Sequence, residues 1–180
     1  MRTLIFDIDG TLTDMGPIEK TVFEAMAPLQ QPGMNKSALR ALYANTFCRL
    51  ARQGRLPAPV AYKAVDFIKS NTSQYRFIYA TGACRVEADF VLDLLGIVGA
   101  FDLGQSISAD DCRFSKQSGI PLRRLKRQFP DSLLITDGLN DIAGAQKAGM
   151  PALLLRPNET LTVSAIQQVQ GFGLRPLLLH

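Results

Sequence analysis

The sequence predicts an α/β fold, a doubly wound parallel sheet with a small helical segment inserted after the first strand. Two observations carry this prediction. From about residue 74 onward, short apolar runs alternate with helical patterns, as in parallel strands joined by helices on both faces of a sheet. Before that point, two helical patterns broken by proline and glycine follow the first apolar run.

The elements can be assigned in chain order. The first strand ends in the apolar run 4–6, and Gly10 marks the turn out of it. Two helices follow, one starting at Pro17 and one capped by Asn35, which form the predicted insertion 16–55. Residues 1–15 and 56–180 would form the main domain. Further strands are expected at 76–80, 100–103 extending toward 107, 132–136, 152–155 and 174–179, and helices at 59–70, 83–95, 121–129, 140–148 and 159–169.

Composition places the chain among ordinary globular proteins. Its 180 residues are 47% hydrophobic and 20% charged, which suits one good core and argues against disorder. The longest apolar runs, such as 152–155, are far shorter than the ~18 residues of a membrane span. The first strand follows Met1 so closely that no leader segment is expected, which predicts a cytoplasmic location. Three widely spaced cysteines fit neither a disulfide framework nor a zinc site.

Charge and histidine content narrow the function classes. The only histidine is His180, which excludes Ser-His-Asp, Cys-His and multi-histidine metal sites from the core. Acid–base chemistry must therefore fall on carboxylates. The net charge of +4 is compatible with small phosphates, nucleic acid or no anionic partner. The basic residues within 123–127 alternate with leucine at helical spacing, which predicts a solvated helix face, so neither nucleic acid nor a membrane is expected as a partner.

Two carboxylates lie where the first buried strand ends. Side chains alternate along a strand, so Asp7 and Asp9 can share a face, and each raises the cost of ionising the other. A simple turn capped by Asp7 would leave the second acid beside an apolar strand without a partner. A cation would resolve this conflict. The pair therefore predicts a metal and nucleophile site.

Three later strand ends carry further polar groups. Thr81 and Gly82 offer a hydroxyl and a backbone N–H just ahead of a helix, which suits an anion, although a lone threonine there could simply cap the helix. Lys116 follows the next predicted strand and would, alone, be a solvated loop lysine. Asp137 and Asp141 occupy a strand-to-helix turn, and helix capping explains one of them but hardly both. Together these groups supply what phosphoryl transfer requires.

The order of these groups resembles the haloacid dehalogenase (HAD) superfamily of phosphohydrolases. Its four motifs match DIDGTLTD, the ATG of YATGACR, Lys116 and DGLND, and the match spans nearly the whole chain. Within the superfamily, the chain resembles the branch of phosphoglycolate phosphatases and β-phosphoglucomutases, which have a small helical cap. The resemblance implies a Rossmann-like core, a cap at 16–55, Mg²⁺ as cofactor and a small phosphorylated metabolite as substrate of a phosphoric monoester hydrolase.

The resemblance also implies a role for each motif residue. Asp7 would attack phosphorus and become a phosphoaspartate. Asp9 would protonate the leaving oxygen and then deprotonate the attacking water. Asp7, the backbone carbonyl of Asp9 and Asp137 would bind the metal.

The remaining motif residues would act on the phosphate or through other groups. Thr81, the N–H of Gly82 and Lys116 would bind the phosphoryl oxygens. Asp141 would orient a metal-bound water or Lys116. At Gln117 many capped relatives have proline instead.

Other functions stay open at this point. A cap without histidine favours hydrolysis over a phosphomutase, and Asp9 disfavours dehalogenation. Thr136 also departs from the family pattern, since glycine often precedes the acid there. A phosphoaspartate signalling module of receiver type also combines acids, Thr and Lys on a parallel sheet, but its acceptor acid lies on an internal strand and it has no cap insertion. A basic nucleic-acid-binding protein would show binding that weakens steeply with salt.

Overall fold

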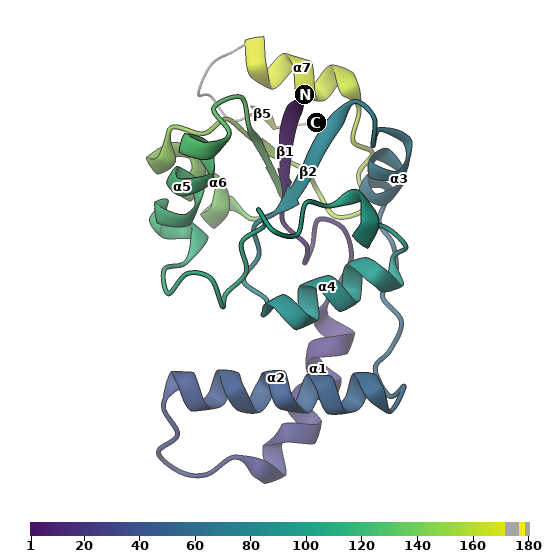
Figure 1. The fold of residues 1–180 in the computed structure, drawn as a ribbon, viewed down its shortest axis with the longest axis vertical. Coiled ribbons are helices and arrows are strands. Elements are labelled where there is room, and N and C mark those ends of the chain that lie inside the picture. The colour runs from purple at the N-terminus through teal and green to yellow at the C-terminus, as the bar shows by residue number, and fades with distance from the viewer. Residues whose placement is uncertain (172–176, 179–180) are drawn as a thin grey trace.

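The structure is a computed structural model in which residues 1–171 and 177–178 are described (Figure 1). The five strands within these residues are all parallel, and their spatial order is β2-β1-β3-β4-β5. The strands are β1 (Arg2–Phe6), β2 (Tyr75–Tyr79), β3 (Leu133–Thr136), β4 (Ala152–Leu154) and β5 (Leu177–Leu178). The predicted parallel α/β sheet is therefore confirmed, and β1 lies inside it between β2 and β3.

Helices cover both faces of the sheet, as a doubly wound fold requires. Along β1, Leu4 and Phe6 belong to one apolar cluster and Ile5 to another, because successive side chains point to opposite faces. The Ile5 face packs against α5 (Ile120–Gln128) and α6 (Leu139–Ala148). The opposite face packs against α3 (Lys63–Ser70), α4 (Arg85–Leu94) and α7 (Val163–Gly171). The sheet is thus buried on both sides, so most of the strand residues are apolar.

The segment after β1 forms a pair of helices away from the sheet (Figure 1). These are α1 (Gly16–Met26), which continues into a 3₁₀ turn, and α2 (Lys36–Arg52). As predicted, Asn35 caps α2, accepting a hydrogen bond from the backbone N–H of Ala38 at 2.9 Å. On α2, Phe47 packs edge-on against Phe90 of α4, with ring centroids 5.4 Å apart. The helix pair therefore contacts the rest of the chain at α4.

One predicted strand is wrong. The segment 100–107 does not form a strand: after a 3₁₀ turn at Val98–Ala100 it makes isolated bridges to the β2 segment at Phe101 and Ile107. Between these two buried residues, a turn closes when the N–H of Gln105 donates to the carbonyl of Asp102 at 3.1 Å. The apolar ends of the segment resembled a strand, whereas the turn between them prevents continuous pairing. The chain that leads to Lys116 is consequently irregular.

The other boundaries differ from the prediction by a few residues. The helix expected from residue 59 begins at Lys63, and the one expected from 159 begins at Val163. Of the strand expected at 174–179, residues 177–178 form β5, and the rest lies outside the described residues. Across the described ranges, none of the helices combines the length and apolar character that crossing a bilayer would demand.

Candidate active site

The residues predicted from the four motifs meet in one cavity of about 410 Å³. It lies at the carboxyl ends of β1, β2 and β3, where ligands bind in open parallel sheets. Its lining contains all seven of them: Asp7, Asp9, Thr81, Gly82, Lys116, Asp137 and Asp141. Residues more than 100 positions apart in the sequence are thus brought together by the parallel strand order.

Asp7 extends β1 by one residue and turns its side chain into the cavity. Its N–H donates to the carbonyl of Ile135 at 2.9 Å, which continues the pairing with β3. Its carboxylate lies 2.7 Å from the Nζ of Lys116 and accepts the N–H of Ile8 at 2.9 Å. Ile8 itself is buried, as strand alternation predicts. Asp7 is therefore fixed by backbone and by charge, while its carboxylate still faces the cavity.

Lys116 is placed by the packing of the following turn on α6. It begins a 3₁₀ turn, Lys116–Ser118, and its ammonium group pairs with Asp141 as well as Asp7. On α6, Gly144 lies against this turn so closely that an added Cβ would be 2.1 Å from the carbonyl oxygen of Lys116. Glycine at this helical position therefore allows the approach that carries Lys116 into the cavity. This lysine is not the solvated loop residue that its sequence context alone suggested.

The charges in this cluster shift one another's protonation. Burial raises the pKa of Asp7 to about 7, an effect that Lys116 opposes and Asp141 increases. Burial by itself would lower the pKa of Lys116, but the two carboxylates outweigh it and raise that pKa above its usual range. Lys116 is consequently a permanent cation in the cavity. It is the group that favours the ionised form of Asp7.

Thr136 connects the two carboxylates beside Lys116. Its buried hydroxyl lies 3.2 Å from the Asp141 carboxylate and 3.5 Å from that of Asp7, and it accepts the N–H of Gly138 at 3.1 Å. A glycine at this position, as is frequent in the resembled family, would leave these oxygens without the hydroxyl. The departure from the family pattern thus adds a polar contact between β3 and α6.

Asp137 follows β3 and lies against the turn of the first motif. The Thr11 hydroxyl donates to its carboxylate at 3.2 Å and accepts its N–H at 3.1 Å. Gly10 has φ +72°, and a Cβ there would lie 2.1 Å from an Asp137 oxygen, so the close approach requires glycine. Asp9, in the same turn, is exposed and accepts the N–H of Met15 at 2.8 Å. The carboxylates of Asp9 and Asp137, which come from distant motifs, therefore both accept hydrogen bonds from the chain that follows β1.

The donor groups of this region fit a hard cation. In the part of the chain that the structure describes, no three His, Cys, Asp or Glu side chains form a cluster that would hold a metal by themselves. The lining of the cavity instead includes Asp7, Asp9 and Asp137, whose side chains carry oxygen donors only. Magnesium is usually held by one or two carboxylates and keeps several waters. This set of oxygen donors therefore suits Mg²⁺ better than a metal that prefers nitrogen or sulfur.

Thr81 and Gly82 form a short turn on the other side of the cavity. The N–H of Thr81 donates to Ile107 at 2.9 Å, and its hydroxyl accepts the N–H of Ala83 at 3.2 Å. Helix α4 begins later, with Cys84 as its N-cap residue, so Thr81 caps its own turn and not the helix. Gly82 is exposed, with open space beside its Cα, and among residues 1–171 and 177–178 its N–H has no hydrogen-bond partner. This N–H is available to an anion.

Some residues that build the site were missed by sequence reasoning. Thr11 and Thr136 contact the acidic side chains, and Gly144 admits Lys116. Threonine beside a motif carries little signal because it is common in strands and turns. An isolated glycine within a helical pattern is a better signal, since it lowers helix stability unless packing requires it. Gly144 could have been flagged in this way.

Comparison with solved structures identifies the fold. An HAD hydrolase of family IA, variant 3, from Entamoeba histolytica superposes with a TM-score of 0.62 at 14% identity, covering 100% of this chain and 93% of the other. A predicted phosphoglycolate phosphatase from Haemophilus somnus gives 0.68 at 16% identity, with 93% and 90% covered. CbbY from Rhodobacter sphaeroides, solved in complex with phosphate, gives 0.68 at 16% identity, with 89% and 88% covered.

At the sequence level, no family model and no curated protein matches the chain. The structural matches cover nearly the whole chain and nearly the whole of each neighbour. The chain therefore has the fold of the HAD hydrolases, and the resemblance predicted from its motifs is confirmed at the level of the fold.

Proposed function

We propose that this protein is a magnesium-dependent phosphatase that hydrolyses a small-molecule phosphomonoester through a phosphoaspartate intermediate. The observation that carries the proposal is the pairing of the Asp7 carboxylate with Lys116 at the end of a central strand, in the same cavity as Asp9. A carboxylate nucleophile, a cation for the phosphoryl group and a second acid are the groups that this chemistry needs. The HAD fold supports the same assignment.

In the first step, a carboxylate oxygen of Asp7 attacks phosphorus as the bond to the ester oxygen breaks. The leaving oxygen takes a proton from Asp9, the exposed acid of the same turn. Lys116, the Thr81 hydroxyl and the free N–H of Gly82 hold the phosphoryl oxygens, whose negative charge they complement. The product of this step is an alcohol and a phosphorylated Asp7.

In the second step, water attacks the phosphorus of the acyl phosphate and Asp9 takes its proton. Asp7 is released as a carboxylate and inorganic phosphate leaves. Mg²⁺, held by Asp7, Asp137 and the Asp9 carbonyl, would neutralise phosphoryl charge during both steps. Asp141 and Thr136 keep Lys116 and Asp7 in place by the contacts described above. Each of the seven motif residues then has a role in the reaction.

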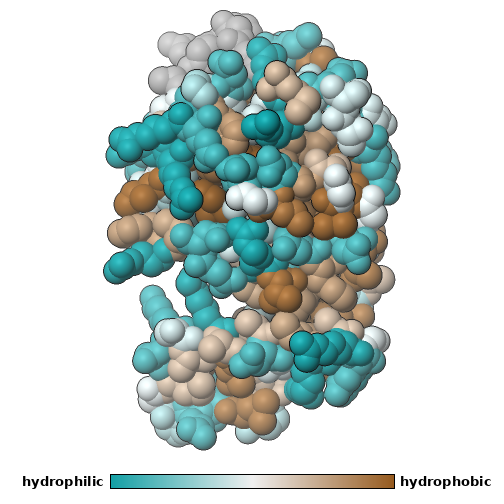
Figure 2. Space-filling model, viewed as in Figure 1, coloured by the Kyte–Doolittle hydropathy of each residue, from teal (hydrophilic) through white to brown (hydrophobic). Residues whose placement is uncertain are grey.

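The size and the surroundings of the cavity favour a small substrate. A second cavity of about 570 Å³ shares Glu19, Gly82 and Ala83 with the first, and side chains of α1 and α2 line it. Figure 2 shows the molecular surface hollowed between the helix pair and the core. Volumes of this order suit metabolites. We propose that residues 16–55 act as a cap, whose side chains face the leaving group and select the substrate.

Two alternatives make different predictions. A receiver-type signalling module would accept one phosphoryl group and would have no use for the helix pair that lines the second cavity. A phosphomutase needs an acid–base group in its cap, and the cap segment 16–55 contains no histidine. Hydrolysis is the reaction that the available groups support.

The decisive experiment counts turnovers. Purified protein is incubated with a generic aryl phosphate and Mg²⁺, and released phosphate is measured per mole of protein. Many equivalents support the phosphatase, whereas a single equivalent supports the signalling module. Full activity in excess chelator would remove the magnesium requirement. A screen of phosphorylated metabolites then identifies the preferred leaving group.

A second experiment tests the covalent route. Asp9→Asn keeps the nucleophile but removes the proton donor and the base for water, each worth typically 10²–10⁴-fold. An activated aryl leaving group needs no proton, so phosphorylated Asp7 should accumulate. Rapid quench followed by mass analysis of the peptide that contains Asp7 detects it. A folded, magnesium-binding Asp9→Asn protein that never carries phosphate on Asp7 would contradict the mechanism.

A further inference from the structure

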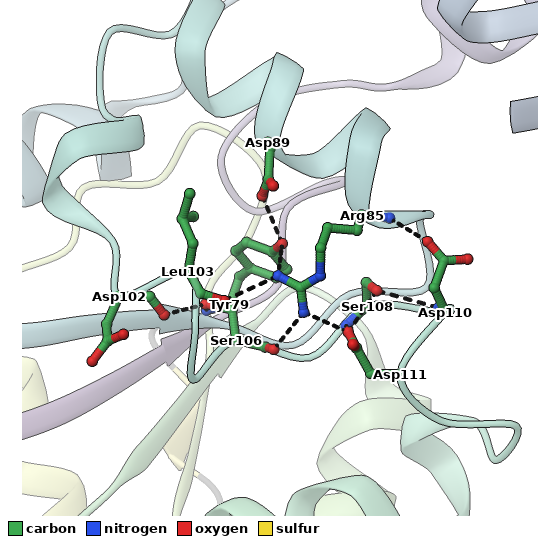
Figure 3. Close-up of polar contacts among 9 residues, drawn as sticks. All are labelled: Tyr79, Arg85, Asp89, Asp102, Leu103, Ser106, Ser108, Asp110 and Asp111. Carbon is green, nitrogen blue, oxygen red and sulfur yellow. Dashed lines mark hydrogen bonds and ion pairs between the residues drawn. The ribbon is translucent and has the colours of Figure 1, made fainter.

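Outside the cavity, the side chain of Arg85 contacts polar groups of Tyr79, Asp111 and the backbone between them (Figure 3). One guanidinium nitrogen donates to the hydroxyl of Tyr79 and to the carbonyl of Leu103, both at 3.0 Å. The other donates to the carbonyl of Ser106 at 2.8 Å and to the carboxylate of Asp111 at 2.6 Å. One side chain thus connects the end of β2, the start of α4 and the loop 103–111.

The same loop is held by carboxylates at its far end (Figure 3). Asp111 accepts both the N–H and the hydroxyl of Ser108 at 2.7 Å, in addition to Arg85. Asp110 accepts the backbone N–H of Arg85 at 2.8 Å, which supplies the cap that Cys84 does not provide for α4. The loop and the first turn of α4 are therefore fixed to each other by side-chain and backbone contacts of a single residue.

This loop in turn holds the backbone on both sides of Gly82. The carbonyl of Ile107 accepts the N–H of Thr81, and the carbonyl of Ala83 accepts the N–H of Ala109, both at 2.9 Å. The peptide of Gly82 lies between these two bonds and has no such partner within the described chain. Its position therefore depends on the loop 107–109, whose own position depends on the contacts of Arg85.

We propose that Arg85 is a positioning residue for the phosphate-binding turn, acting through the loop 103–111 without touching the substrate. The inference rests on the proposed function, since it deepens the account of the same site. An ion pair of this exposure alone would be worth little, with both side chains 32% exposed. The planar guanidinium of Arg85 donates to four acceptors, two of which are backbone carbonyls. These bonds together fix the geometry of the loop. Lysine cannot reproduce such a planar set of donors.

The effect of removing this constraint should be selective. A small displacement of a binding group can cost about 100-fold in rate. Arg85→Gln should therefore raise both the KM for an aryl phosphate and the inhibition constant for inorganic phosphate by about 10-fold or more. The concentration of Mg²⁺ that gives half-maximal activity should stay unchanged, because Asp7 and Asp137 are held by β1 and β3. A general loss of packing would change phosphate and magnesium affinities together.

The experiment uses the full-length protein with inorganic phosphate as the probe. Phosphate-dependent thermal stabilisation, measured with Mg²⁺ present, reports binding without turnover. The matched control is Arg76→Gln, since Arg76 also lies on the β2 side and pairs with Asp102 of the adjacent loop at 4.0 Å, with similar exposure. Arg85→Lys should fall between wild type and Arg85→Gln. Asp111→Asn, which keeps the other three contacts of Arg85, should show a smaller loss of the same kind.

The outcomes separate this inference from the proposed function. A wild-type protein that neither releases nor binds phosphate would overturn the proposed function. A wild-type protein that binds phosphate, with equal affinity in Arg85→Gln, would overturn the role of Arg85 alone. An equal loss of magnesium affinity in Arg85→Gln would also overturn this role. So would an equal loss of phosphate affinity in Arg76→Gln. If Arg85→Gln does not fold, the phosphate and magnesium affinities of Arg85→Lys and Asp111→Asn provide the same test.

Discussion

The two sides of the cavity are built in different ways. The proposed metal side, Asp7, Asp9 and Asp137, comes from residues directly after two adjacent strands, β1 and β3. The proposed phosphate side, Thr81, Gly82 and Lys116, depends on an irregular loop and on packing against α6. Strand ends are fixed by the sheet itself, whereas loops must be fixed by other side chains. The difference predicts which substitutions abolish the chemistry and which only weaken phosphate binding.

The largest effect is expected from Asp7→Asn, because in the proposed mechanism Asp7 is both the nucleophile and a metal ligand. The amide cannot act as the nucleophile, so turnover should fall by about 10⁴-fold or more, the scale on which a covalent nucleophile contributes. Phosphate release from an aryl phosphate is the measurement. Asp93→Asn, an exposed residue on α4, is the matched control and should retain wild-type activity. Substantial turnover by a folded Asp7→Asn protein would mean that another group is the nucleophile.

The next largest effect separates the metal side from the phosphate side. Asp137→Asn should raise the Mg²⁺ concentration for half-maximal activity by more than about 100-fold, since even groups that only orient metal ligands cost 10–100-fold. Asp141→Asn should instead raise KM by about 10-fold with an unchanged magnesium requirement, because Asp141 contacts Lys116 and Thr136. Magnesium titrations of both variants provide the comparison. Equal shifts in magnesium requirement would mean that the two roles are wrongly divided.

The same division explains how much the sequence could predict. The carboxylates of the metal side follow short apolar strands, and parallel strands bring their carboxyl ends to one edge of the sheet. The motifs and the fold therefore both predict a site at this edge. The fold class followed from the alternation of strands and helices for the same reason.

The phosphate side could be predicted only in part. Lys116 was predicted to follow a strand, but that segment is irregular in the structure, so the family motif and not a strand end indicated its position. The contacts of Arg85 join residues 79 to 111, and no local pattern reports such a network. Long-range side-chain contacts to loop backbone have no periodicity, so sequence reasoning cannot find them.

A third prediction tests how Lys116 is placed. Gly144→Ala adds a Cβ that would lie 2.1 Å from the Lys116 carbonyl oxygen, so the turn must move and carry its side chain away from Asp7. KM should rise by about 10-fold, while the magnesium requirement stays constant. In a helix, alanine is more favourable than glycine by up to ~1 kcal/mol. This gain offsets part of the stability that the clash with Lys116 costs. Gly99→Ala, whose added Cβ meets open space, is the control and should leave KM unchanged. An unaffected KM in Gly144→Ala would show that Lys116 does not depend on this contact.

The smallest effect on activity is expected where α2 of the helix pair meets α4. There the Tyr43 hydroxyl donates to the buried Glu87 carboxylate at 2.6 Å. Burial raises the pKa of Glu87 from 4.5 to about 6, although the Tyr43 hydrogen bond opposes that rise. The folded protein therefore holds this proton more tightly than the unfolded chain does. The resulting contribution to stability is complete below pH 4.5 and is lost as the pH rises through 6.

Glu87→Gln removes the titrating carboxyl group. Comparing the stability of this variant with that of the wild type therefore isolates the contribution of Glu87. Relative to the Gln variant, the wild type should lose on the order of 2 kcal/mol of unfolding free energy between pH 4 and 7, from a pKa difference of roughly 1.5. Tyr43→Phe removes the hydrogen bond that favours the ionised carboxylate, so the window should move to higher pH. Denaturant unfolding of the three proteins across this range is the measurement. Neither variant should alter the magnesium requirement or phosphate inhibition, because Tyr43 and Glu87 belong to neither side of the cavity. A stability difference that stays constant with pH would mean that Glu87 titrates alike in the folded and unfolded chains.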